Sequence, residues 1–438
     1  MANGTVAQAD PKQAVRTSSS QRLPSLDGLR GIAAMVVVVH HALLTWPVLY
    51  AQYTGPNRES ATWWLTFTPL HITWAGREAV TVFFILSGIV LVLPYLGPKK
   101  VGTWPGYLVR RIMRLYPPVA AALVLSAVLV AAFPRNPVAG ATTWYSRHDV
   151  DVTWSGFFHD LVLIDGTGMI NSVLWSLRYE VAFSLLLPIV VLVVRRMPRR
   201  LWFTLPASLA LVVLGQYSGS HWAAWLSIFG VGVALAMGMD DMRRLAACIE
   251  RSALRGVIWT FLITASIALM LAEWIFRGLH VPTATWVVNT PPMVTLGGAL
   301  ACFIVLGCPA ANRLFSGRFL QWAGRISFSL YLVHEPVAVS IASLVTPGTI
   351  GTVLTVLGTC AVSVVLATLL HRFVEAPCQQ WSRDLGTCVD RGIGPRGRHV
   401  AAAPTTTAGP HVTAAPVRPR ITPRPAPTAE VGGLVDAR

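Results

Sequence analysis

The first apolar stretch of the chain carries an arginine and a histidine at a spacing that could support chemistry. Arg30 and His41 are eleven residues apart. In an α-helix this is about three turns, so both side chains share one face, ~16 Å apart along the axis. A guanidinium suits phosphate oxygens, and an imidazole can move a proton near neutral pH. A donor with an anionic head and a long thin arm, such as acyl-coenzyme A, fits this separation.

One other interpretation of this helix stays open. His41 could simply form a hydrogen bond to a neighbouring helix. His40 points about 100° away from His41 around the helix, so we expect it to be a packing or supporting residue.

A second pair of charged residues, Arg178 and Glu180, opens another apolar stretch. Residues two apart on a helix do not face each other, so each needs a partner elsewhere. On the topology given below, Glu180 and His41 both lie in the outer half of the bilayer. A carboxylate beside an imidazole would fix its tautomer and raise its basicity, so we expect Glu180 to act with His41. The alternative is a structural ion pair between helices.

A basic cluster, Arg110, Arg111 and Arg114, lies in a predicted inner loop. Together with Arg30, these guanidinium groups could hold the phosphates of a coenzyme. They could equally be an ordinary run of charge at the end of a span. The sequence contains no glycine-rich phosphate loop, dinucleotide fingerprint or metal-ligand cluster. We therefore expect no metal.

His334 and Glu335 lie in the middle of a later apolar stretch, directly before Pro336. An ionisable side chain inside a bilayer is costly unless it faces protein or water. A proline leaves one helix carbonyl without its usual hydrogen bond. The simplest interpretation is that His334 compensates this carbonyl.

The composition indicates which elements must position these residues. Of 438 residues, 54% are hydrophobic and 12% are charged, against about 25% charged in an average soluble protein. This excludes a soluble enzyme, a disordered protein and a fibrous one, and it predicts an all-α bundle of membrane helices. Ten spans are predicted, at about 31–47, 79–96, 118–133, 173–194, 201–216, 222–238, 257–275, 291–308, 327–345 and 351–370.

The placement of charge orients these spans. With both termini in the cytoplasm, the inner loops carry sixteen Lys and Arg and the outer loops carry five, as the positive-inside rule requires. The net charge of +16 then reflects topology, and we expect no nucleic-acid partner. We predict a polar N-terminal tail (1–22), a membrane domain (23–380) and a basic, disordered cytoplasmic tail rich in Pro, Ala and Thr (381–438).

Six segments carry a resemblance to a known family. They are SLDGLRGIAA (25–34) with the interval from Arg30 to His41, FFILSG (83–88), RRIMRLYP (110–117), WSLRYE (175–180), SFSLYLVH (327–334) and RFVEAP (372–377). In this order, over about residues 22–380, they resemble the acyltransferase-3 family of integral membrane O-acyltransferases.

The resemblance implies a multi-pass enzyme of the plasma membrane that transfers an acetyl or longer acyl group to a hydroxyl, with acyl-coenzyme A as donor and acetyl-coenzyme A as its expected form. The acceptor would be a glycan or a small molecule such as a macrolide. His41 matches the family's catalytic histidine, Arg30 the arginine that engages the donor, and Glu180 the glutamate of the fourth helix. Many members have a second acidic residue where this chain has Val181, so a mechanism with two carboxylates does not carry over.

Two functions of other classes remain as alternatives. A proton-coupled transporter or flippase of glycans or drugs also uses intramembrane His and Glu, although no inverted repeat is evident. A non-catalytic scaffold has no need of buried charges. The sequence leaves the acceptor, the acyl chain length, the oligomeric state and the exact role of His41, as a base or as an acylated group, undecided.

Overall fold

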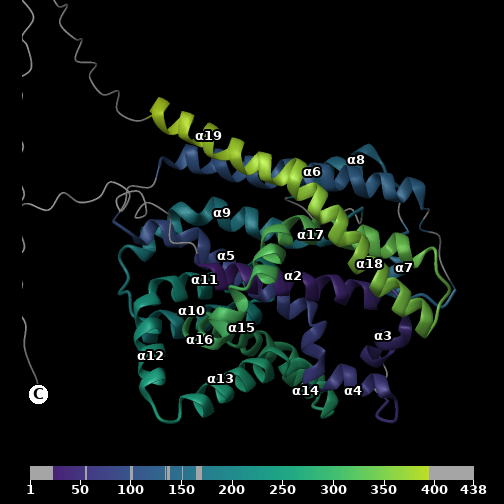
Figure 1. Cartoon of the computed structure of the whole chain (residues 1–438), viewed down its shortest axis with the longest axis horizontal. Helices are drawn as coiled ribbons and strands as arrows, with labels where there is room; N and C mark the ends of the chain where they lie inside the picture. The colour runs from purple at the N-terminus through teal and green to yellow at the C-terminus, as the bar shows by residue number, and fades with distance from the viewer. Residues whose placement is uncertain are drawn as a thin grey trace, which may run out of the picture. The chain divides into compact units, whose positions relative to one another are not determined.

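A computed structural model describes residues 23–54, 57–98, 102–133, 135, 139–149, 151–163 and 170–393. These ranges contain helices and turns but no β-strand, so the prediction of an all-α fold is confirmed (Figure 1). The predicted N-terminal tail and residues 394–438 of the predicted C-terminal tail lie outside the described residues.

The helices that build the bundle vary in length. The long ones are α2 (Pro24–Leu44), α5 (Gly76–Leu96), α6 (Trp104–Ala132), α9 (Trp175–Val194), α15 (Thr283–Gly307), α17 (Arg318–Ala342) and α18 (Thr349–Leu370), joined by α10 (Leu201–Tyr217), α11 (His221–Met237) and α13 (Arg255–Met270). Shorter helices connect them: α3 (Pro47–Thr54), α4 (Ala61–Phe67), α7 (Thr143–Ser146), α8 (Trp154–Val162), α12 (Met239–Arg251), α14 (Ala272–Gly278), α16 (Pro309–Phe315) and α19 (Ala376–Ile393).

Each predicted span overlaps a helix, but the count of ten is not confirmed. Within the described ranges, six helical segments are long and apolar enough to cross a membrane, and eight if each bent pair is one span. The bent pairs are α11 with α12, at 66°, and α13 with α14, at 69°. Helix α10 is only 17 residues long. Helix α17, which carries polar and ionisable residues, is not among the six.

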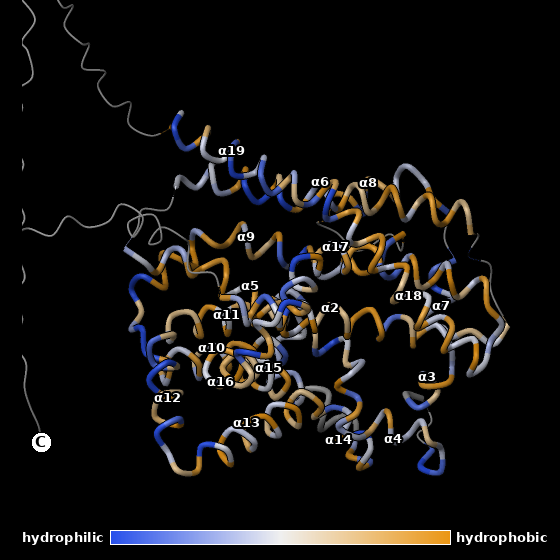
Figure 2. Tube along the Cα trace, in the orientation of Figure 1, coloured by the Kyte–Doolittle hydropathy of each residue, from blue (hydrophilic) through white to orange (hydrophobic). Residues whose placement is uncertain are grey.

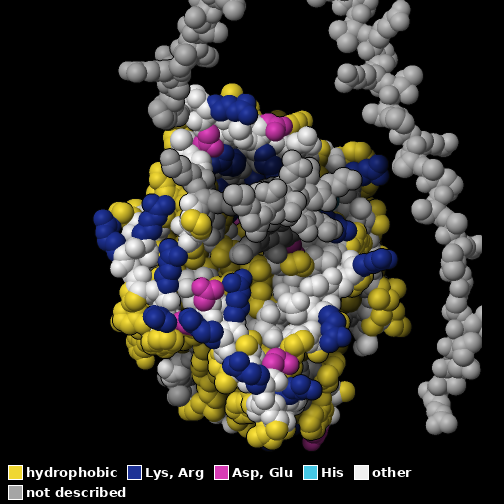
Figure 3. All heavy atoms as spheres, turned by 60° about the vertical axis from the view of Figure 1, so that its left-hand side comes forward, with side chains coloured by type: hydrophobic (Ala, Val, Ile, Leu, Met, Phe, Trp, Pro, Cys, Tyr) yellow, Lys and Arg dark blue, Asp and Glu magenta, His cyan; other side chains and the backbone are white. Residues whose placement is uncertain are grey.

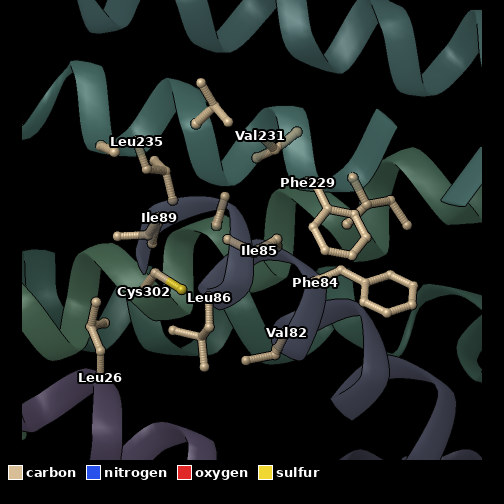
Figure 4. Close-up of a cluster of buried hydrophobic side chains, with 14 of the residues drawn as sticks. Leu26, Val82, Phe84, Ile85, Leu86, Ile89, Phe229, Val231, Leu235 and Cys302 are labelled. Atoms are coloured by element: carbon tan, nitrogen blue, oxygen red, sulfur yellow. The ribbon is translucent and has the colours of Figure 1, made fainter. Parts of the chain in front are cut away.

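Helix α5 lies at the centre of the main hydrophobic core. Its side chains Val82, Phe84, Ile85, Leu86 and Ile89 pack against α11, α15 and α2 (Figure 4). Phe84 stacks on Phe229 with ring centroids 4.6 Å apart. Glu78 and Thr81 of this helix are buried, so these polar side chains can reach only other protein groups.

Helices α2 and α17 pack backbone against backbone. A Cβ added at Gly31 would clash with the backbone around Gly324, and one at Gly324 would clash with Asp27. Glycines permit such a close approach between membrane helices. The two helices run in the same direction, because Gly324 lies beside the start of α2 while His334 lies beside His41 near its end. Residues that are 293 positions apart in the sequence, His41 and His334, are thereby placed side by side.

Charged residues gather at one end of the bundle, as the predicted inner loops require. The polar helices α12 and α19 stand out in the hydropathy colouring (Figure 2). On the face shown in Figure 3, basic side chains outnumber acidic ones. Exposed arginines of these loops include Arg195, Arg196, Arg199, Arg200, Arg243, Arg244, Arg251 and Arg255.

The helical part continues beyond the boundary predicted at residue 380. After α18 comes η4 (His371–Glu375), a single π-helical turn, and then α19, which reaches Ile393. Helix α19 packs along α6 (Figure 1), where Asp390 accepts hydrogen bonds from Thr103 and Arg110. Residues 381–393 therefore belong to the bundle, because this polar segment has a partner that the sequence alone did not reveal.

Candidate active site

Arg30 and His41 lie on one uninterrupted helix, α2. The helix begins with Pro24, whose missing N–H costs nothing at a helix start. Both side chains are partly exposed. The predicted arrangement, two side chains on one face about three turns apart, therefore holds.

A small pocket, with a cavity volume of about 30 Å³, lies beside Arg30. Aromatic rings and hydroxyls form most of its wall, with one cation and one carboxylate. The lining residues are Arg30 of α2; Val80, Phe83, Phe84 and Ser87 of α5; Ser176, Leu177 and Glu180 of α9; and Ser327, Phe328 and Tyr331 of α17.

Three of the four predicted donor-binding arginines meet around Glu180. Arg111 donates from Nη2 to Glu180 Oε1 at 2.7 Å and from Nε to Ser184 Oγ at 2.9 Å. Arg30 and Arg114 lie within electrostatic range of the same carboxylate. Neither of them makes a hydrogen bond or ion pair to any described residue, and Nε of Arg30 is buried.

The charges of this cluster do not balance. A second carboxylate, Glu375, interacts electrostatically with Arg30 and Arg114, but it already accepts hydrogen bonds from Ser329 at 2.6 Å and His371 at 3.0 Å. Three guanidinium groups thus face two carboxylates, of which Glu180 is bound to Arg111 and Glu375 to Ser329 and His371. Unpaired arginines beside a pocket suit an anionic ligand. Nothing in the sequence pointed to Glu375 except its place in the RFVEAP segment.

Arg110 does not join this cluster. Its Nη1 donates to Asp390 Oδ2 at 2.8 Å, on the side of α6 that faces α19. Arg111, the next residue on α6, points about 100° away and donates to Glu180 instead, so the two guanidinium groups have different partners. The predicted donor-binding role therefore has no geometric support at Arg110.

Glu180 and His41 are not brought together. The carboxylate of Glu180 is held by Arg111, while the ring of His41 contacts groups on α2 and α17. The prediction that Glu180 orients His41 assumed that the two side chains lie at the same depth in the bilayer and face each other. The position of α6 shows instead that Arg111 is the partner of Glu180. Arg178 donates to the hydroxyl of Tyr179 at 2.8 Å.

The partner of His41 is His334. Nδ1 of His41 lies 3.0 Å from Nε2 of His334 and 3.1 Å from the carbonyl oxygen of Val37. The ring of Trp144 lies 5.5 Å away. His40 contacts the carbonyl oxygen of Trp74 through Nδ1 at 2.9 Å, which fits its predicted supporting position.

His334 is not the residue that compensates Pro336. The carbonyl freed by this proline is that of Leu332, four residues earlier. It accepts a hydrogen bond from Nδ2 of Asn171 at 2.8 Å. Asn171 lies in the segment before α9, and no pattern in the sequence predicts its hydrogen bond to Leu332.

Glu335, next to His334, is engaged from another side. His148 contacts its Oε1 through Nε2, and the backbone N–H of Ser172 donates to its Oε2 at 2.8 Å. All of these groups are buried or nearly so. His148 was not anticipated, since it lies in a predicted outer loop.

Tyr331 connects the pocket with the histidine pair. It lines the pocket, and its ring lies 5.6 Å from the ring of His334. Its hydroxyl is 2.7 Å from Ser176 Oγ and donates to the carbonyl of Val173 at 3.1 Å. A path of neighbouring groups thus leads from Arg30 through Tyr331 to His41.

Comparison with known proteins assigns the chain to a family. The acyltransferase-3 family model, described as an acyltransferase domain, matches residues 23–372. No solved structure matches.

Three relatives illustrate the range of similar proteins. Acyltransferase MdmB of Streptomyces mycarofaciens is 28% identical over 403 residues, covering 82% of this chain and 92% of the relative. O-acetyltransferase PaAT-1 of Phomopsis amygdali is 24% identical, with 71% of each chain covered. Peptidoglycan O-acetyltransferase OatA of Listeria monocytogenes is 24% identical over 83% of this chain, which spans only 56% of that relative.

The family model covers most of the chain, and these relatives are named for acyl or acetyl transfer. This protein therefore belongs to the acyltransferase-3 family and is an acyltransferase of groups other than aminoacyl groups.

Proposed function

We propose that the protein is a membrane-bound O-acyltransferase that moves an acetyl or short acyl group from acyl-coenzyme A to a hydroxyl. The acceptor is a carbohydrate or a glycosylated or macrolide small molecule. The observation that carries the proposal is the pocket. It is lined by Arg30, which has no partner among the described residues, and by Tyr331, whose ring neighbours His334, the partner of His41. A relative named for peptidoglycan O-acetylation supports a carbohydrate acceptor.

The donor binds with its phosphates at Arg30 and Arg114. Both guanidinium groups lack protein partners in the described part of the chain, so their hydrogen bonds are available to an anion. Arg111 contributes charge while it holds Glu180 in place. The extended pantetheine arm would run along the ~16 Å rise between Arg30 and His41.

His41 then takes the proton of the acceptor hydroxyl. The hydroxyl oxygen attacks the thioester carbonyl, the C–O bond forms, the C–S bond breaks, and the coenzyme thiolate receives the proton from His41. Such a base contributes about 10²–10⁴-fold in rate. A variant in which His41 is transiently acylated uses the same residue as a nucleophile.

The experiment is acyl transfer in membranes that contain this protein. Radiolabelled acetyl-coenzyme A is supplied to the wild type, to His41→Ala and to His40→Ala. We expect label to enter a lipid-linked, polysaccharide or small-molecule fraction, with loss of at least about 100-fold in His41→Ala and a milder effect in His40→Ala.

The labelled fraction identifies the acceptor class. Equal labelling by the wild type and His41→Ala would contradict the mechanism. Substrate flux across vesicles without any acyl donor would instead support the transporter alternative.

A further inference from the structure

The two imidazoles of His41 and His334 form a direct hydrogen bond between helices α2 and α17. Nδ1 of His41 and Nε2 of His334 are 3.0 Å apart, and the ring centroids are 5.0 Å apart. His334 is completely buried, whereas His41 is partly exposed. One ring is thus accessible to a substrate, and the other is held inside the bundle.

The neighbouring carbonyls decide where the protons lie. A carbonyl oxygen can only accept a hydrogen bond. Nδ1 of His334 is 3.1 Å from the carbonyl oxygen of Leu330, so it must carry a hydrogen. In a neutral imidazole, Nε2 of His334 then bears the lone pair.

The same argument applies to His41. Its Nδ1 is 3.1 Å from the carbonyl oxygen of Val37 and faces the lone pair of His334, so this nitrogen also carries a hydrogen. Nε2 of His41 is left with a lone pair and with no hydrogen bond to the described residues. This nitrogen is the one atom of the pair that can accept a proton from a substrate.

We propose that His334 is a positioning residue for acyl transfer, which holds His41 as the Nδ1–H tautomer and presents Nε2 as the base. The proposal rests on the proposed function. When Nε2 of His41 takes the acceptor proton, the Nδ1–H···Nε2 hydrogen bond to His334 becomes charge-assisted and therefore stronger. His334 stabilises the imidazolium without itself touching the substrate.

The other candidate partners of His41 are occupied. Glu180 is paired with Arg111. Glu335 is held by His148 and by the N–H of Ser172, so it acts on His41 through its charge alone. A histidine thus fills the position that a carboxylate occupies beside the histidine of many hydrolases.

Two substitutions of His334 test this role, and they differ in whether the new side chain can accept a hydrogen bond from His41. In His334→Gln, the side-chain amide oxygen can occupy the place of Nε2 and accept the hydrogen bond. In His334→Ala, no acceptor remains except the carbonyl of Val37. Ser340→Ala is the matched control, because Ser340 is buried on the same helix and its hydroxyl has no partner among the described residues.

The tautomer is measured directly, without substrate. Two-bond nitrogen–proton correlation spectra of protein with ¹⁵N-labelled histidine distinguish a protonated Nδ1 from a protonated Nε2, and the His41 signals are assigned by difference from His41→Ala. We expect the Nδ1–H tautomer in the wild type, His334→Gln and Ser340→Ala, and a tautomer mixture in His334→Ala. A proton on Nε2 of His41 in the wild type would overturn the proposal.

Kinetics provide the second readout. Loss of an orienting partner typically costs 10–100-fold, so we expect kcat of His334→Ala to fall by about that factor while KM for acetyl-coenzyme A stays within about twofold. His334→Gln should recover most of the rate. If His334→Gln is as slow as His334→Ala with its tautomer intact, the acceptor role is wrong. If the tautomers behave as expected but the wild type transfers no acyl group, the proposed function fails instead. Acetyl transfer by His41→Ala at the wild-type rate would contradict the role of His41 as the base.

Discussion

Arg30 and Arg114 differ from the other arginines of the site in having no partner within the described chain. Arg111 is bound to Glu180 and Arg110 to Asp390. At the scale of single residues, the site is therefore divided into cations that hold the fold and cations that are available to a ligand. Substitutions of the first kind of arginine should therefore change the stability of the protein, and substitutions of the second kind should change ligand binding.

The first prediction concerns Arg114. A hydrogen bond to a charged group contributes about 1.5–3 kcal/mol, so Arg114→Ala should raise KM for acetyl-coenzyme A by about 10–100-fold. Arg110→Ala is the control, since it removes an equal charge four residues away on the same helix. Its KM should be unchanged, because Arg110 serves the contact with α19. Equal effects of the two substitutions would refute this assignment.

The second prediction concerns the ion pair of Glu180 and Arg111. Their side chains are 15% and 12% exposed. Removing one partner of a buried pair leaves an uncompensated charge, which costs about 3–5 kcal/mol. Glu180→Ala should therefore lower the thermal unfolding midpoint in detergent, and the double variant Glu180→Ala/Arg111→Ala should be less destabilised than the sum of the single variants. Strict additivity would show that the two residues are not coupled.

At the scale of elements, the short segments near the end of α2 form a second packed layer of aromatic side chains. Phe67 of α4 and Trp274 of α14 belong to one cluster, and His71 in η2 (Pro69–Thr73) lies 4.1 Å from the rings of both Trp74 and Trp274. Burial holds the pKa of His71 well below its usual value of 6.5.

The third prediction follows from this shift. Below pH 6.5 the unfolded chain binds a proton at His71 that the folded chain does not, so stability is present above this pH and is lost on acidification. The unfolding midpoint of the wild type should fall more between pH 7.5 and 5.5 than that of His71→Phe, which keeps a ring between the tryptophans. Identical pH dependences would exclude a contribution from His71.

At the scale of the whole molecule, the distribution of charge predicts which side of the membrane each end of the bundle faces. Cys248 in α12 is exposed, and α12 belongs to a predicted inner loop. Glu59 is exposed in a predicted outer loop. The two sites offer a direct test of topology.

The fourth prediction is that a membrane-impermeant thiol reagent modifies Cys248 only after cells are permeabilised. A Glu59→Cys variant, in a background without other cysteines, should react in intact cells. Cys248 is likewise tested in a protein without other cysteines. Both single-cysteine proteins must retain acyl transfer, which shows that they are folded. Labelling of Cys248 in intact cells would show that the predicted orientation is reversed.

The sequence alone determined the features that depend on one helix or on total composition. The common face of Arg30 and His41 follows from helix geometry, which is the same in every protein. The all-α membrane class follows from the shortage of charge, because a bilayer admits few charged residues. The family followed from six short segments in the right order.

Only the tertiary structure decided which side chains meet across helices. The pairing of Glu180 with Arg111, of Arg110 with Asp390 and of His41 with His334 depends on the depth and rotation of each helix. These are set by close contacts such as that of Gly31 with Gly324. The spacing of residues along one helix has a fixed geometry, whereas a partner on another helix is chosen by the packing of the whole bundle.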